Sequence, residues 1–83
     1  MTKILIVEDD LNICNFVKTI LSTHCYQVIT AHNSKNGEMM FHSHRPDLLI
    51  LDLGLPDGDG MDFLRKVRKE FSTPIIVLSA RMD

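Results

Sequence analysis

The sequence predicts an α/β fold in which an open parallel sheet carries helices on both faces. Three short apolar runs are continuous rather than alternating, as in strands buried on both faces of a parallel sheet. These runs are KILIV, LLIL and PIIVLS, at residues 3–7, 48–51 and 74–79. Helical spacing lies between them, so the order β-α-β-α-β-α-β is expected, with right-handed crossovers placing helices on both faces.

After the first strand, the apolar residues repeat at the i, i+3, i+4, i+7, i+8 spacing of one helix face. They are Ile13, Phe16, Val17, Ile20 and Leu21. We expect this face to be the apolar side of a helix, opposite the polar residues Asn15, Lys18 and Ser22.

The next strand and helix have weaker patterns. The segment YQVIT at residues 26–30 alternates around Val28, which indicates an edge strand with one wetter side. Residues 34–43 contain Gly37, and their only apolar residues are the group Met39, Met40 and Phe41. We expect a short or mobile helix there, with this apolar group in the core.

A third helix precedes the last strand. Leu64, Val67 and Phe71 repeat at i, i+3, i+7, and the acids Asp59 and Asp62 lie where helix starts favour negative charge. The interleaved basic residues predict a solvated face: Arg65, Lys66, Arg68 and Lys69.

Length and composition exclude several classes of protein. A chain of 83 residues is one domain at most. Its formal charge of −2 leaves no excess of positive charge for direct binding of nucleic acid. The N-terminal apolar run is too short for a signal peptide or a membrane span, so we expect a cytoplasmic protein. The two cysteines suggest reduced thiols, and the four histidines match no zinc pattern.

Acidic residues follow two of the predicted strands. The first strand runs into Glu8, Asp9 and Asp10, and the third runs into Asp52. Ligands in such sheets bind beyond the carboxyl ends of the strands, and clustered carboxylates there call for a hard cation such as Mg²⁺. Acids after a strand are also common surface residues, so the topology alone leaves both interpretations open. A calcium loop starting at Asp57 fails on ligand spacing.

Three motifs, ILIVEDD, LLILDLGLPDGDG and PIIVLSA, together resemble the receiver domain of two-component response regulators over the whole chain. Within that family the chain looks most like the winged-helix (OmpR/PhoB-type) transcriptional regulators. The resemblance implies a flavodoxin-like sheet in the order 2-1-3-4. It also implies a signalling phosphoacceptor, not an enzyme, that takes a phosphoryl group from a sensor histidine kinase and controls a DNA-binding output domain.

The resemblance also assigns roles to single residues. Asp52 matches the phosphoacceptor, Asp9 a direct Mg²⁺ ligand, and Glu8 a ligand that acts through a water. The backbone carbonyl of Gly54 matches the third protein ligand of the metal, and Ser79 matches the hydroxyl that senses the phosphoryl group.

A complete receiver continues with a further helix, a fifth strand that carries a lysine, and a last helix. We therefore expect residues 1–83 to be a truncated receiver domain. We also expect self-association, through the apolar edge at residues 75–78 or through the uncovered sheet face on the side of the first helix. One alternative is a haloacid dehalogenase-type phosphotransferase or phosphatase, although that family requires a second aspartate where this chain has Gly54. Another is a receiver-like interaction domain that is not phosphorylated.

Overall fold

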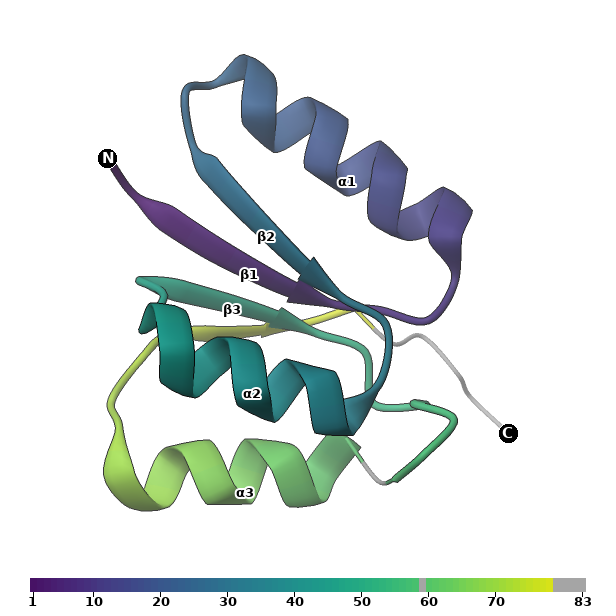
Figure 1. Ribbon diagram of the computed structural model, residues 1–83, viewed down its shortest axis with the longest axis vertical. Coiled ribbons are helices and arrows are strands. Elements are labelled where there is room, and N and C mark those ends of the chain that lie inside the picture. Colours follow the sequence, from purple (N-terminus) through teal and green to yellow (C-terminus); the bar gives the residue numbers. More distant parts are fainter. Residues whose placement is uncertain (59, 79–83) are drawn as a thin grey trace.

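Four parallel strands form a sheet in the order β2-β1-β3-β4, as expected (Figure 1). The structure, a computed structural model, describes residues 1–58 and 60–78. The strands are β1 Lys3–Val7, β2 Gln27–Ala31, β3 Leu48–Leu51 and β4 Ile75–Val77. The sheet therefore has β2 at one edge and β1 and β3 side by side at its centre, which is where the winding changes direction.

The strand register brings the carboxyl ends of three strands to one edge of the sheet. Val7 pairs with both Ala31 and Leu51. The ladder continues for one more residue, because the amide of Glu8 donates to Ala31 at 3.0 Å and the amide of Asp52 donates to Val7 at 2.9 Å. Backbone hydrogen bonds thus fix both acids where they leave the sheet.

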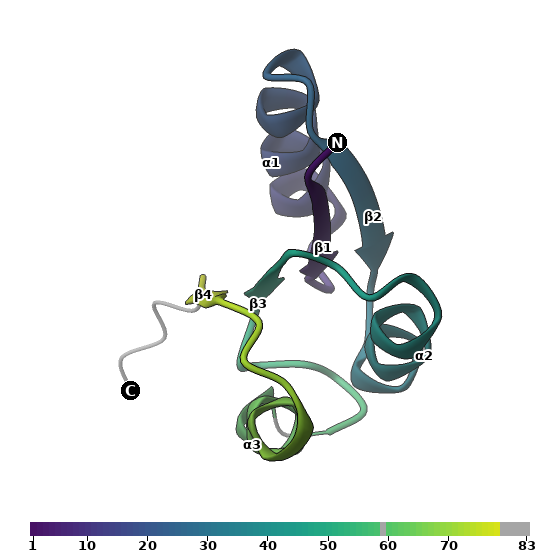
Figure 2. The same ribbon diagram turned by 90° about the vertical axis from the view of Figure 1, so that its left-hand side faces the viewer.

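Helices cover both faces of the sheet. α1 (Leu11–Thr23) lies on one face, and α2 (Ser34–His44) and α3 (Gly60–Glu70) lie on the other (Figures 1 and 2). Alternate residues of β1 face the two sides: Leu5 and Val7 join the core below α2 and α3, and Ile4 and Ile6 join the core below α1. All four are at most 2% exposed, which explains why the run is continuously apolar.

The face of α1 that packs on the sheet overlaps only in part with the one that we expected. Cys14 is fully buried against Ile6 and Ile50, and Val17 and Leu21 pack beside it. Three residues of the expected face are instead exposed, by 44%, 68% and 44%: Ile13, Phe16 and Ile20. The apolar side of α1 is wider than the surface that the sheet covers, so docking of Cys14 decides which residues are buried.

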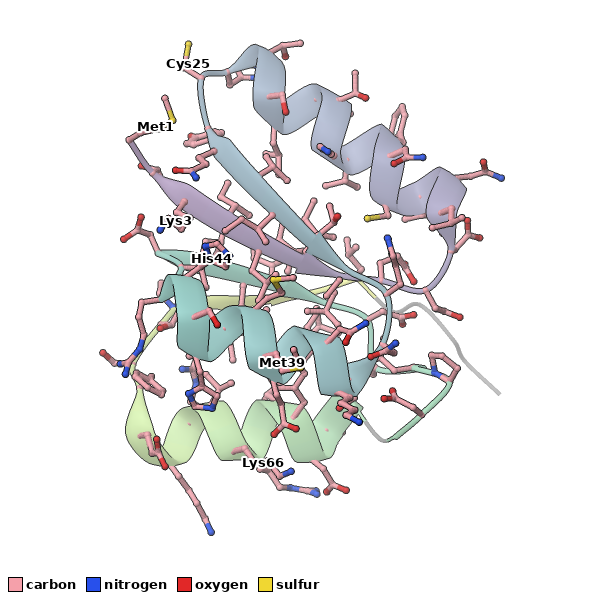
Figure 3. The ribbon with its side chains drawn as sticks, viewed as in Figure 1. Met1, Lys3, Cys25, Met39, His44 and Lys66 are labelled. Atoms are coloured by element: carbon pink, nitrogen blue, oxygen red, sulfur yellow. The ribbon has the colours of Figure 1, made fainter. Side chains whose placement is uncertain are left out.

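α2 starts where we expected and extends one residue past the predicted range 34–43, so its 11 residues make it as long as α3. A Cβ atom on Gly37 would lie 2.6 Å from Phe63 and 3.0 Å from Val7, so glycine allows α2 to pack closely on β1 and α3. In the apolar group of α2, Phe41 is buried as expected, but Met39 is 56% exposed (Figure 3).

The far end of α2 is tied to the start of the sheet. Lys3 lies beside His44, and its ammonium group donates to the carbonyl of His44 at 3.0 Å (Figure 3). The backbone amide of Lys3 also donates to the Asp47 carboxylate at 2.8 Å. These contacts hold β1, the end of α2 and the start of β3 together.

The remaining predicted elements need small corrections. β4 is shorter than residues 74–79, and Ile76 and Val77 are 50% and 42% exposed along it. The basic face of α3 is solvated as expected, with Lys66 pairing with Glu38 of α2 at 3.1 Å. Asp59 lies outside the described residues. In the part of the chain that the structure describes, no helix is long and apolar enough to cross a membrane.

Candidate functional site

Three acids from the ends of β1 and β3 form one cluster. One carboxylate oxygen from each of Glu8, Asp9 and Asp52 lies within 4.8 Å of the other two. Glu8 and Asp52 are only 4% and 6% exposed, whereas Asp9 is exposed to solvent. The cluster therefore has a buried base and one open side.

Burial, together with a hydrogen bond to the Asp52 side chain, raises the pKa of Glu8 from 4.5 to about 7. The amide of Asp10, which donates to Oε2 of Glu8 at 3.3 Å, acts in the opposite direction. Two carboxyl groups can share a hydrogen bond only when one of them holds a proton. Near neutral pH the pair thus holds a proton in a place that a cation could take.

The loop after β3 orients the carboxylate of Asp52. The amide of Gly54 donates to Oδ1 of Asp52 at 3.0 Å, and Leu55 is buried in the core. The loop closes where the amide of Gly60 donates to Leu53 at 3.1 Å. A Cβ atom on Gly60 would lie 2.5 Å from Cα of Leu53, so this close approach requires glycine.

Asp10 does not join the other acids. It is the N-cap of α1, where its Oδ1 accepts from the amides of Asn12 at 2.9 Å and Ile13 at 3.2 Å. An aspartate directly before the first helical residue is a common N-cap, so this role was available from the sequence. Asp10 thus stabilises the helix that follows the two acids of the cluster.

Other predicted site residues lie as follows. Ser79 is outside the described residues, and the Gly54 carbonyl as a ligand stays a prediction. His32 is an exposed residue that lies beside the cluster, because its Nδ1 donates to the carbonyl of Glu8 at 3.0 Å. Cys14 and Cys25 are free thiols, as expected.

The donor set of the cluster suits a hard cation. All three side chains offer carboxylate oxygens, which Mg²⁺ and Ca²⁺ prefer, and neither histidine nitrogen nor cysteine sulfur belongs to the group. Mg²⁺ commonly uses one or two carboxylates and keeps several waters, which fits a cluster with one side open to solvent. The residues present therefore fit the expected metal.

Comparison with known proteins gives one family. A family model described as the response regulator receiver domain matches residues 4–83. The KDP operon transcriptional regulatory protein KdpE of Escherichia coli (strain K12) is 46% identical over the whole chain, and the response regulator ArlR of Staphylococcus aureus (strain Mu50 / ATCC 700699) is 43% identical. The chain spans 37% and 38% of these two relatives. The sequence segments DLGLPDGDG and VLSAR themselves look most like the regulator of the Kdp potassium-transport system, and the KdpE relative agrees with that resemblance.

Solved structures show the same fold. A two-component response regulator from Clostridium difficile matches with a TM-score of 0.94 at 29% identity, covering 100% of this chain and 69% of its own. The BeF3-activated N-terminal receiver domain of Klebsiella pneumoniae RstA matches with a TM-score of 0.92 at 30% identity, covering 99% and 70%. The strand order and the helices on both faces are thus those of known receiver domains.

Proposed function

The chain belongs to the receiver domain family of two-component response regulators, and from this we propose that it is a phosphoacceptor that takes up a phosphoryl group on Asp52. The observation that carries the proposal is the position of this aspartate. Asp52 is buried at the end of a central strand, next to Glu8 and Asp9, and the Gly54 amide orients its carboxylate.

The transfer is a substitution at phosphorus. An oxygen of the Asp52 carboxylate attacks the phosphorus of a phosphohistidine on a sensor histidine kinase. The new O–P bond forms as the N–P bond breaks, and the electron pair of that bond stays on the imidazole nitrogen. The product is an acyl phosphate on Asp52 and a neutral histidine on the kinase.

The acid cluster prepares the site for this chemistry. Asp9, Asp52 and the carbonyl of Gly54 would hold Mg²⁺ directly, with Glu8 acting through a water. When bound, the ion supplies positive charge against the oxygens of the phosphoryl group. Glu8 must release its proton first, because ligand groups and their water partners are needed in the ionised form. We assign the hydroxyl of Ser79 to contact with the transferred group.

The same proposal includes the partners. A sensor histidine kinase is the phosphodonor, and the KdpE relative, named as a transcriptional regulatory protein, supports control of a DNA-binding output domain. We also propose a cytoplasmic location, because bacterial transcriptional regulators act where the chromosome lies. In this role residues 1–83 form a receiver unit that is a signalling phosphoacceptor and not an enzyme with turnover.

The alternatives have less support. Family membership and Gly54, two residues after Asp52, count against a haloacid dehalogenase-type phosphotransferase or phosphatase. A receiver-like interaction domain without phosphorylation does not require three converging acids, yet Glu8, Asp9 and Asp52 are all present and close together.

Intact mass spectrometry after exposure to acetyl phosphate and Mg²⁺ tests the proposal. We expect a phosphate-sized gain in the wild type and none in Asp52→Asn. Asp62→Asn is a matched control, because Asp62 is an exposed acid on α3 that pairs with Arg65, and this variant should gain the same mass as the wild type. No gain in the wild type while Mg²⁺ binds would contradict the phosphoacceptor role, and repeated turnover of a phosphate ester would favour the haloacid dehalogenase alternative.

A further inference from the structure

The loop that follows Asp52 is attached to the start of α2 by the carboxylate of Asp57. Its Oδ1 accepts from the amide of Ser34 at 2.6 Å, and its Oδ2 accepts from the amide of Lys35 at 3.0 Å. Figures 1 and 2 both show the loop between β3 and α3 running past the first turn of α2. A residue of the site loop therefore caps a helix that lies more than twenty residues earlier in the chain.

The start of α2 is a strong place for this attachment. The first amides of a helix lack partners within the helix, and the helix dipole favours negative charge there. The side chain of Asn33, the N-cap of α2, accepts from the amide of Asn36 at 2.8 Å. Asp57 supplies acceptors for the two amides in between, and these same hydrogen bonds lower the pKa of its carboxyl group.

The loop between the site and this cap has an anchor at each end. At one end the amide of Gly54 is bound to Asp52, and at the other end Asp57 is bound to α2. α2 in turn lies against β1, because Gly37 approaches Val7, the residue directly before Glu8. Through α2, the loop after β3 is thus aligned with the strand that carries the other two acids.

We propose that Asp57 is a positioning residue, whose hydrogen bonds to Ser34 and Lys35 hold residues 53–58 in the conformation that aligns Asp52 and Gly54 with the acids of β1. The inference rests on the proposed function, since it concerns the same metal site. Binding of Mg²⁺ and attachment of the loop then stabilise each other, because each favours the same conformation.

A purely structural role for Asp57 makes a different prediction, and Asn33 separates the two. Asn33→Ala removes a cap from the same turn of α2 without releasing the site loop. Asp57→Ala removes a cap and releases the loop. If capping only stabilises α2, both variants leave Mg²⁺ affinity unchanged. If Asp57 positions the loop, only the Asp57 variant changes it.

The experiment is an isothermal titration of the whole chain with Mg²⁺, below the unfolding range of every variant. We expect the dissociation constant to rise about threefold to tenfold in Asp57→Ala, by less in Asp57→Asn, which keeps one acceptor, and not at all in Asn33→Ala. We also expect Mg²⁺ to slow hydrogen exchange at the amides of Ser34 and Lys35 in the wild type but not in Asp57→Ala.

Each of the other possible outcomes overturns a stated part of the proposal. Equal Mg²⁺ affinities in Asp57→Ala, Asn33→Ala and the wild type, or equal losses in both variants, overturn the positioning role and leave the phosphoacceptor proposal intact. Equal losses in Asp57→Asn and Asp57→Ala, with no response of the α2 amides to Mg²⁺, would assign the effect to charge alone and also overturn it. A wild type that binds no Mg²⁺ overturns the metal site itself and this inference with it.

Discussion

Replacing Glu8 with glutamine removes the ionisable group from the most buried carboxyl of the acid cluster, which is 4% exposed. The change keeps the size of the side chain and removes its charge. Because Glu8 lies against Asp52, its ionisation in the absence of a cation places a second negative charge in a buried site. Glu8→Gln therefore tests whether the cluster is strained when it holds no metal.

The magnitude follows from the pKa of Glu8, which burial and the hydrogen bond with Asp52 raise from 4.5 to about 7. In the unfolded chain Glu8 loses its proton near pH 4.5, whereas the folded protein keeps it until about pH 7. The resulting stabilisation is complete below pH 4.5 and is lost as the pH rises to about 7. At about 1.4 kcal/mol for each pH unit, the loss amounts to about 3 kcal/mol.

The assay is urea unfolding of the wild type and Glu8→Gln from pH 4.5 to 8 in the presence of a chelator. The free energy of unfolding of Glu8→Gln, relative to that of the wild type, should rise by about 3 kcal/mol across this range. The difference between the two proteins cancels the titration of groups that they share. Added Mg²⁺ should stabilise the wild type more strongly as Glu8 ionises, because the cation then replaces the proton.

A difference between the two proteins that stays constant from pH 4.5 to 8 would refute this reasoning. Asp57→Asn, measured in the same way but with the range extended below pH 3.8, is a control of opposite sign. The amides of Lys35 and Ser34 lower the pKa of Asp57, so the advantage of the wild type over this variant should be present above pH 3.8 and shrink as the pH falls below it. A common slope in both comparisons would indicate a global effect of pH.

Two further predictions concern packing and assembly. Gly37→Ala should lower the free energy of unfolding by about 1–3 kcal/mol, because the new Cβ atom would lie 2.6 Å from the buried ring of Phe63. This loss should exceed the gain of about 1 kcal/mol that alanine brings to a helix over glycine. A variant that is more stable than the wild type in urea unfolding would contradict this prediction. Residues 1–83 on their own should self-associate through the exposed edge at Ile76 and Val77, and Ile76→Lys should reduce association in sedimentation velocity. A wild type that sediments as a monomer at every concentration would exclude this edge.

The strands were predictable from local patterns, and the docking face of α1 was not. A strand buried on both faces has no polar positions, so its sequence marks it directly. In α1, however, Ile13 and Cys14 both lie one turn before Val17, at i−4 and i−3, so either could continue its apolar stripe. Which one is buried depends on how Cys14 fits against Ile50 of β3, and helical spacing holds no information about that contact.

The residues of the site also divide into those whose position could be predicted from the sequence and those whose position could not. The approach of Glu8 and Asp9 to Asp52 could be expected, because the carboxyl ends of parallel strands meet at one edge of the sheet. The N-cap role of Asp10 could also be expected from local sequence, because Asp10 directly precedes the first residue of α1. The same aspartate belongs to the run of acids after β1, so its type alone does not separate it from the metal-binding acids. The contact of Asp57 with α2 had no local signal, because its partners lie on another element and only the folded chain brings them together.

α2 is held at both ends by other parts of the chain. Asp57 binds its first turn, and the ammonium group of Lys3 binds the carbonyl of its last residue, His44. With Gly37 in its middle, α2 has little stability of its own, so it should open together with the sheet as one cooperative unit instead of fraying from its ends. Protection of its amides in native-state exchange would then report at once on the contacts at the amino ends and at the carboxyl ends of the strands.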